Sequence, residues 1–238
     1  MINLPRLYAI LDAAFFCSSQ ELVAFAEKLA TGGCTLLQYR NKSGNARVML
    51  EQARELKRRL SHPNAAKNVA LEWGTQDRNS HVSQRRRDVG HPCIEGPIRL
   101  IMNDRADLCL AADFDGVHVG QEDLTPESAR KIIGPERWLG VSTHNPEQIR
   151  EADLTSADYL AIGPVFATSS KEKPDPVVGL EGVRRARELT RKPLVAIGGI
   201  TRANAASVIA AGADSVAVIS DLLREPHKSA EEFLRILR

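Results

Sequence analysis

Short apolar runs alternate along the chain with segments in which apolar positions recur every three or four residues. The runs are typical of buried parallel strands, and the longer segments are typical of amphipathic helices that cover them. We therefore expect strands at 7–12, 35–40, 99–103, 116–120, 138–143, 159–165, 193–199 and 215–220. Helices are expected at 18–30, 46–60, 106–112, 125–133, from 145 onward, 180–190, 202–211 and 229–237.

Three of these helices carry clear start signals. Ser18 with Glu21 forms a capping-box pattern, and Thr125 and Asn145 are cap residues followed by a first-turn proline. Asp104 could likewise cap the helix that follows it. Because Thr125 takes the cap role in its own loop, Asp123 is free for another task.

Eight strand–helix units in succession predict an α/β fold, a single (β/α)8 TIM barrel spanning residues 1–238. A doubly wound open sheet is the alternative, but eight is the number of strands that closes a barrel. The segment 61–95 has no sustained period and its charges nearly cancel. We expect it to be a mobile, irregular insertion between the second helix and the third strand, on the N-terminal face, with Val69, Leu71 and Trp73 as candidates for docking.

Composition narrows the class of protein. The 238 residues include 32 basic and 30 acidic side chains, a net charge of +2 that predicts no nucleic-acid partner. No apolar run is long enough for a membrane helix, and the first residues lack the layout of a secretion signal. The 4 cysteines form no CxxC pair, which favours a reducing, cytoplasmic location.

Polar residues gather where the strands are expected to end, which in a barrel is the face of the active site. Alternation points Gln38, Arg40 and Lys42 the same way, and this group suits an anion such as pyrophosphate, although a solvated strand end would look similar. Asp104 and Asp123 end neighbouring strands. Two adjacent carboxylates either share a proton or hold a cation, and oxygen ligands beside a phosphate suggest Mg²⁺.

A second anion site is expected on the other side of the barrel mouth. The loop Thr168-Ser169-Ser170-Lys171 offers hydroxyls and a cation, and Gly199 and Ser220 follow the last two strands, where barrels commonly bind phosphate. A simple helix-entry turn is the alternative there. His118 is interpreted as a packed or barrel-facing histidine and His144 as a loop histidine. The pattern contains no nucleophile–histidine–acid arrangement, which disfavours a hydrolase.

Taken in order, these motifs resemble the thiamine phosphate synthase family over nearly the whole chain outside 61–95. The motifs are Gln38-x-Arg40-x-Lys42, Asn103-Asp104-Arg105, Asp115-Gly-Val-His-Val-Gly-Gln-Glu-Asp123, Gly140-Val-Ser142, Gly163-Pro-Val-Phe-x-Thr168-x-Ser170-Lys171, Ile197-Gly-Gly199-Ile and Ala217-Val-Ile-Ser220. Each motif alone is weak, and the ordered set is specific.

The resemblance implies a transferase of thiamine biosynthesis. It would join 4-amino-5-hydroxymethyl-2-methylpyrimidine diphosphate to a thiazole phosphate, or its carboxylated form, and release pyrophosphate with Mg²⁺ as cofactor. Asp104 and Asp123 would bind the metal, and Arg40, Ser142 and Lys171 would act with them on the diphosphate. Residues implied to bind the two substrates are Gln38, Tyr39, Arg40, Asn41, Lys42, Asn103, Ser142, Thr168, Ser169, Ser170, Lys171, Gly199, Ile219 and Ser220.

Small departures and two alternative functions stay open at this point. Ser170 stands where the family often has threonine, and 172–176 is rich in proline. A related thiazole tautomerase-like isomerase would use a residue such as His144 for proton transfer. A non-catalytic phosphate-binding regulator would use the insertion as a partner surface. Pyrophosphate release in the presence of both substrates separates the first function from these two.

Overall fold

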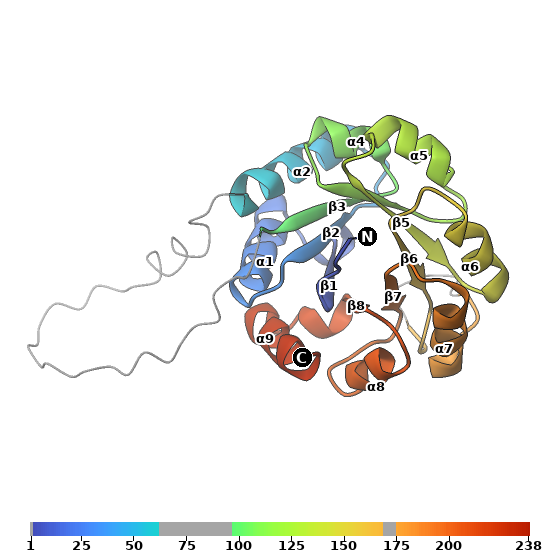
Figure 1. Cartoon of the computed structure of the whole chain (residues 1–238). Coiled ribbons are helices and arrows are strands. Elements are labelled where there is room, and N and C mark those ends of the chain that lie inside the picture. The colour runs from blue at the N-terminus through green and yellow to red at the C-terminus, as the bar shows by residue number, and fades with distance from the viewer. Residues whose placement is uncertain (1, 62–96, 169–174) are drawn as a thin grey trace, which may run out of the picture.

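The computed structural model describes residues 2–61, 97–168 and 175–238. Its parallel strands form one closed barrel in sequence order (Figure 1). The strands are β1 (Leu7–Asp12), β2 (Leu36–Arg40), β3 (Arg99–Asn103), β4 (Gly116–Val119), β5 (Trp138–Thr143), β6 (Tyr159–Ile162), β7 (Leu194–Ile197) and β8 (Ser215–Val218). The ring closes because Ala9 of β1 is paired with Leu37 on one side and with Val218 on the other. The predicted (β/α)8 fold is confirmed.

Helices surround the barrel as an outer layer (Figure 1). They are α1 (Ser19–Thr31), α2 (Ala46–Leu60), α4 (Ala106–Ala111), α5 (Pro126–Ile133), α6 (Pro146–Asp153), α7 (Gly179–Leu189), α8 (Ala205–Ala210) and α9 (Pro226–Ile236), with short 3₁₀ helices η1 (Ala13–Phe15) and η2 (Ser220–Leu222). The expected caps form, since the side chains of Ser18, Thr125 and Asn145 each accept a backbone N–H of their helix.

Several expected bounds differ from the structure by one to three residues. Two of these bounds and one expected cap differ for reasons that the sequence contains. The last helix begins at Pro226 instead of Ser229, because proline at the first helical position needs no N–H partner. The sixth strand ends at Ile162, before Gly163 and Pro164, since proline has no N–H to donate to a strand ladder. Asp104 does not cap α4; Arg105 occupies the cap position, without a side-chain cap hydrogen bond.

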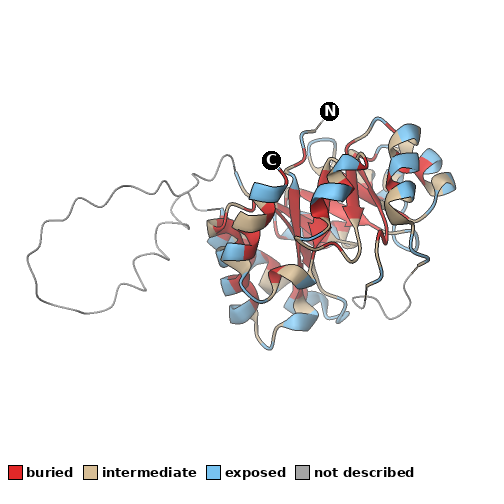
Figure 2. Ribbon diagram, turned by 90° about the horizontal axis from the view of Figure 1, so that it is seen from below, coloured by how far each residue is buried: buried red, intermediate tan, exposed pale blue. Residues whose placement is uncertain are grey.

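Buried residues form two layers, one on each side of the barrel wall. Figure 2 shows that the strands at the centre are almost entirely buried, whereas the helices are buried only in part. The larger layer packs between strands and helices and includes Leu7, Leu37 and Leu139. The smaller layer fills the inside of the barrel and consists of Leu4, Tyr8, Ile10, Leu36, Ile101, Tyr159, Ala161, Val195 and Ala217. Alternate residues of each strand therefore belong to different layers, and two of the largest interior side chains are tyrosines.

An aspartate repeats at the amino-terminal face of the barrel, directly before β4, β6 and β8. Each aspartate makes two hydrogen bonds to one leucine of the preceding strand. The backbone N–H of the aspartate donates to the carbonyl of that leucine, and the carboxylate of the aspartate accepts the backbone N–H of the same leucine. The pairs are Asp115 with Leu100, Asp158 with Leu139 and Asp214 with Leu194, and the carboxylate bonds measure 2.8, 2.7 and 2.8 Å. We call these three double-bonded pairs the aspartate locks, because each fixes the start of one strand to the next.

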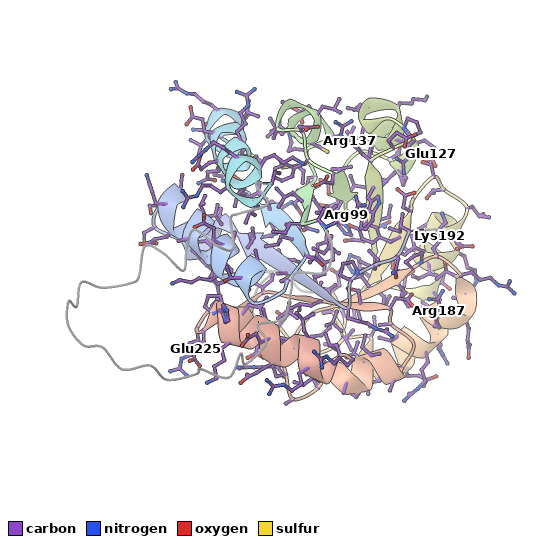
Figure 3. All side chains as sticks on the ribbon, turned by 60° about the vertical axis from the view of Figure 1, so that its left-hand side comes forward. Arg99, Glu127, Arg137, Arg187, Lys192 and Glu225 are labelled. Atoms are coloured by element: carbon purple, nitrogen blue, oxygen red, sulfur yellow. The ribbon has the colours of Figure 1, made fainter. Side chains whose placement is uncertain are left out.

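Each lock also carries a cation from a covering helix. The cations are Lys57 of α2 on Asp115, Arg130 of α5 on Asp158 and Arg187 of α7 on Asp214, at 3.5, 2.6 and 2.9 Å. Arg187 is labelled in Figure 3, as are Arg99 at the start of β3 and Lys192 just before β7. The locks thus join strands to helices at the face away from the carboxyl ends of the strands.

Removing one lock tests its contribution to stability. Asp158→Ala leaves the backbone N–H of Leu139 without its carboxylate acceptor. We therefore expect a loss of about 1–3 kcal/mol in the free energy of unfolding. Urea denaturation measures this loss. Glu51→Ala, which removes an exposed ion pair with Arg47, is the control and should cost no more than about 0.5 kcal/mol. Equal effects of the two changes would contradict a special role for the lock.

The predicted insertion at 61–95 lies outside the described residues, apart from Ser61, which caps the end of α2. Pro97, on the other side of the gap, lines a hollow with Leu4, Thr35 and Arg99 at the amino-terminal ends of the strands. Both flanking residues therefore support an attachment far from the barrel mouth.

Replacing 63–94 with a short Gly/Ser linker tests this placement. Closing a shorter loop changes the entropy by only about 0.6 kcal/mol per halving of length, so the barrel should still fold. We expect kcat/KM to stay within a few-fold of the full chain, as measured by steady-state kinetics, with any penalty appearing in the melting temperature. A folded deletion variant without turnover would show that the segment reaches the mouth.

Candidate active site

The mouth of the barrel holds the polar ends of the strands, as the sequence predicts. On β2, the amide of Gln38 donates to the Tyr8 hydroxyl at 2.8 Å inside the barrel. The Arg40 guanidinium is paired with Asp12 at the end of β1, and the Lys42 ammonium is paired with Asp104, which follows β3. The first three strands thus contribute side chains to one continuous polar surface.

Asp104 and Asp123 lie together at this surface, and the backbone at Asp104 is in the left-handed region with φ +62°. Burial raises the pKa of the Asp104 carboxyl, the neighbouring Asp123 adds to the rise, and the hydrogen bond from Lys42 opposes it. The Asp123 carboxylate accepts the N–H of Gly120 at 2.8 Å. Two facing carboxylates with one raised pKa are an arrangement that a cation would stabilise.

Apart from Asp104 and Asp123, few of the described side chains that could bind a metal ion lie at this part of the mouth. In the described ranges, no three or more His, Cys, Asp or Glu side chains group as they would around a metal ion. Two carboxylates are nevertheless enough for Mg²⁺, which usually takes one or two protein carboxylates and completes its shell with water and substrate phosphate. The donor set therefore fits Mg²⁺ and does not fit a structural zinc site.

A chain of hydrogen bonds crosses the inside of the barrel from β2 to β5. After the bond from Gln38 to Tyr8, it continues from the Tyr8 to the Tyr159 hydroxyl at 3.0 Å and from there to His118 Nδ1 at 3.1 Å. His118 Nε2 then meets the Ser142 hydroxyl at 2.9 Å. We call these five residues the interior chain. Burial lowers the pKa of His118 to about 4, with Asp123 opposing, so the imidazole is neutral at pH 7.

Gly140 makes the room that this chain needs. A Cβ at this position would lie 2.2 Å from Tyr159 Cζ and 2.4 Å from His118 Nδ1, closer than real contacts allow. The glycine of the Gly140-Val-Ser142 motif therefore admits two side chains of the interior chain, while the serine two residues later is its last member.

Tyr39 and Asn41 point away from the mouth. Tyr39 is fully buried, and its hydroxyl donates to Gln52 of α2 at 2.5 Å. The Asn41 amide donates to the same Gln52 oxygen at 3.0 Å. These two candidate binding residues hold the end of β2 against α2, so their side chains are not brought together with Gln38, Arg40 and Lys42.

The opposite side of the mouth is built by the ends of β7 and β8. Gly198 and Gly199 have φ of +99° and +63°, and a Cβ on Gly199 would lie 2.5 Å from the carbonyl oxygen of Ala167. The loop is tied to η2, which begins at Ser220, because Arg202 pairs with Asp221 at 3.0 Å and with Glu232 of α9.

The remaining candidates are placed less fully by the structure. Ser169, Ser170 and Lys171 lie outside the described residues, and Thr168 is the last residue before them. Asn103 ends β3, and Ile219 is partly buried against the interior layer. His144 Nδ1 donates to the Gly163 carbonyl at 2.6 Å, which ties this loop histidine to the end of β6.

Comparisons with known proteins identify the family of the chain. A family model described as thiamine monophosphate synthase matches residues 75–222. The thiamine-phosphate synthase of Koribacter versatilis is 53% identical over 239 residues, covering 99% of this chain and 97% of that protein. The one from Chloroflexus aurantiacus is 40% identical over 215 residues, covering 90% and 83%. The chain belongs to the thiamine-phosphate synthase family.

A solved structure supports the assignment. Thiamine phosphate pyrophosphorylase from Pyrococcus furiosus matches with a TM-score of 0.73 and 29% identity, covering 98% of this chain and 95% of that chain. Members of the family are transferases of thiamine biosynthesis that condense a pyrimidine with a thiazole, both small phosphorylated substrates. In the described ranges, no helix is long and apolar enough to cross a membrane.

Sequence reasoning missed four residues of this family member's mouth and interior. Asp12 ends β1 just as the other candidates end their strands, so that position was the available signal. Tyr8 and Tyr159 look like ordinary apolar residues of buried strands. Gln121, whose amide donates to the Ser142 carbonyl at 2.6 Å, lies within a motif that supports the family resemblance.

Asp12 offers a test of how Arg40 is held. Asp12 is 4% exposed and pairs with Arg40, while its other oxygen accepts the N–H of Ala14 at 3.1 Å. Asp12→Asn keeps a cap for η1 and removes the charge. We expect kcat/KM for the pyrimidine substrate to fall about tenfold or more, equivalent to roughly 1.4 kcal/mol. The KM for the thiazole substrate should not change, and unchanged kinetics for both would show that Arg40 needs no partner.

Proposed function

We propose that the chain joins 4-amino-5-hydroxymethyl-2-methylpyrimidine diphosphate to 4-methyl-5-(2-phosphoethyl)thiazole and gives thiamine phosphate and pyrophosphate with Mg²⁺. With the carboxylated form of the thiazole, CO₂ is released as well and a proton takes its place. The observation that carries the proposal is the facing pair Asp104 and Asp123, with Lys42 paired to Asp104 and a second cation, Arg40, paired to Asp12 at the end of β1. A diphosphate brings negative charge to this place, and the surrounding cations offset it.

The reaction proposed is a dissociative substitution at the pyrimidine methylene carbon. The bond from this carbon to the diphosphate oxygen breaks, and its electron pair leaves with the diphosphate. The thiazole nitrogen then uses its lone pair to form the new carbon–nitrogen bond. That nitrogen carries no proton, so the step needs no general base. His118 is neutral, buried and hydrogen-bonded at both ring nitrogens, which agrees with a reaction that uses no histidine as a base.

The protein's contribution is binding and charge stabilisation. Arg40, Lys42 and Lys171 hold the diphosphate, Ser142 donates to it, and Gln38 and Asn103 bind the pyrimidine side of the substrate. Asp104 and Asp123 would hold Mg²⁺, which supplies positive charge to the departing diphosphate. Cations fixed before the reaction begins stabilise the developing charge without reorganisation.

The thiazole phosphate is proposed to occupy the opposite side of the mouth. Gly199 brings backbone close to the site, and Ile219 and Ser220 lie on the neighbouring loop. Thr168, Ser169 and Ser170 would complete this seat. The ion pairs of Arg202 support the proposal because they hold the β7 and β8 loops at a constant separation.

The synthase is favoured over the tautomerase-like and regulatory alternatives. His144 is hydrogen-bonded to the Gly163 carbonyl, and the relatives are named synthases. A cytoplasmic location is proposed because the described cysteines, Cys17, Cys34 and Cys109, are free thiols, as a reducing compartment would keep them.

Asp123→Asn tests the metal assignment. The amide oxygen can still accept the Gly120 N–H, so the fold should be retained while one anionic ligand is lost. We expect pyrophosphate release to fall by about a hundredfold or more at low Mg²⁺, with partial recovery as Mg²⁺ is raised. Asp113→Asn, at an exposed aspartate with φ +53°, is the control and should match the unaltered enzyme. Full activity of Asp123→Asn at low Mg²⁺ would exclude the assignment.

A further inference from the structure

The interior chain has an internal direction that the proposed reaction does not by itself require. The Gln38 amide nitrogen can only donate, so it takes a lone pair of the Tyr8 oxygen. The Tyr8 proton is then directed to its other neighbour, the Tyr159 oxygen, 3.0 Å away. Since the Tyr159 oxygen now accepts, its own proton is left for the next member of the chain.

That next member is His118, and the direction decides its tautomer. Tyr159 donates to Nδ1 at 3.1 Å, so Nδ1 carries the lone pair and the proton of the neutral ring is on Nε2. The Nε2–H donates to the Ser142 hydroxyl oxygen at 2.9 Å. Ser142 therefore accepts from the barrel interior and keeps its own proton for the mouth.

The opposite tautomer would reverse the chemistry of the mouth. With the proton on Nδ1, Nε2 would accept the Ser142 proton, and the serine would present lone pairs to any anion bound above it. An anionic diphosphate is stabilised by a donor and repelled by lone pairs. The direction of hydrogen bonds buried under the mouth thus controls whether Ser142 helps or hinders.

We infer that Tyr8, Tyr159 and His118 act together as a positioning relay, which holds His118 in its Nε2–H tautomer so that Ser142 donates to the departing diphosphate. The relay is shielded from water: Tyr8, Tyr159 and His118 are 1%, 0% and 7% exposed. Two carboxylates act on it electrostatically, Asp123 on His118 and Asp158 on Tyr159. The inference rests on the proposed function for the identity of the anion, whereas the tautomer itself does not.

The tautomer is measured first, on the free enzyme. ¹⁵N-labelled histidine distinguishes protonated from unprotonated ring nitrogens by NMR, and His118→Gln identifies which of the 6 histidine signals belongs to His118. We expect a proton on Nε2 and none on Nδ1 at pH 7. A proton on Nδ1 would overturn the inference, whether or not the enzyme turns over.

Tyr159→Phe then tests the effect on the reaction. It removes the hydroxyl that donates to Nδ1 and keeps the ring, so the tautomer signal should shift toward Nδ1–H. We expect kcat to fall by up to about a hundredfold, the lower end of what loss of one such donor costs, with the thiazole phosphate KM unchanged. Ser215→Ala removes a fully buried hydroxyl at the start of β8, far from the mouth, and should leave both parameters unchanged.

Variants of Ser142 and His118 show whether the effect passes through Ser142. In a Ser142→Ala background, Tyr159→Phe should lower kcat no further, because the residue through which it acts is already absent. Additive losses would mean that the Tyr159 hydroxyl acts on the substrate directly and would overturn the relay. His118→Gln, whose amide nitrogen can still donate to Ser142, should retain more of kcat than His118→Ala; equal losses would also count against it.

The proposed function and the relay fail in different ways. If the unaltered enzyme releases no pyrophosphate from the two substrates, the function is wrong, and the histidine spectrum still decides the tautomer. If the unaltered enzyme is active while Tyr159→Phe keeps its kcat, the relay alone is wrong. Should Tyr159→Phe not fold, the spectrum of the unaltered enzyme and the comparison of the two His118 variants give the answer.

Discussion

Backbone hydrogen bonds between β1 and β8 close the sheet into a ring, and the site depends on that closure. A closed ring has no free edge, and it turns the carboxyl ends of all strands to one face. It also creates an interior that side chains must fill. Apolar residues such as Ile101 and Val195 fill part of it. Polar groups of the interior chain fill the part under the mouth, where each must be hydrogen-bonded because unpaired buried polar groups are costly.

That interior sets a limit on size as well as on polarity. His118 and Tyr159 come from strands on either side of β5 and meet over Gly140, where a single added carbon would overlap both. The mouth therefore has a floor of fixed shape whose hydrogen-bonding groups already have partners. Substrates approach a surface that is prepared before they arrive, which is the condition for charge stabilisation without rearrangement.

Local pattern was enough to predict most elements. Helix 46–60 and strand 138–143 have the predicted bounds, because caps and apolar period are encoded within a few residues. The strand ends likewise led to Arg40, Asp104 and Asp123. The contacts that could not be predicted join residues far apart in the chain. Tyr8 contacts Tyr159 because the strands close into a ring. Arg40 is paired with Asp12 because of the register between β1 and β2. Tyr39 and Asn41 alternate at the end of β2 with the residues that face the mouth, so their side chains lie on the other side of the strand. There both side chains hydrogen-bond to Gln52 of α2.

The aspartate locks join β3 to β4, β5 to β6 and β7 to β8. The remaining pair, β1 and β2, has Thr35 at the corresponding place, and the described residues show no carboxylate bond of this kind between them. The barrel thus consists of four successive strand pairs, of which three are joined by an aspartate lock at the amino-terminal face. β1 and β2 are joined instead nearer their carboxyl ends, by the hydrogen bond from Gln38 to Tyr8 and by the ion pair of Arg40 with Asp12. In this pair of strands the side-chain bonds that hold the fold together belong to the polar surface of the mouth, so a substitution at Asp12 or Gln38 changes the stability of the barrel and the binding surface together.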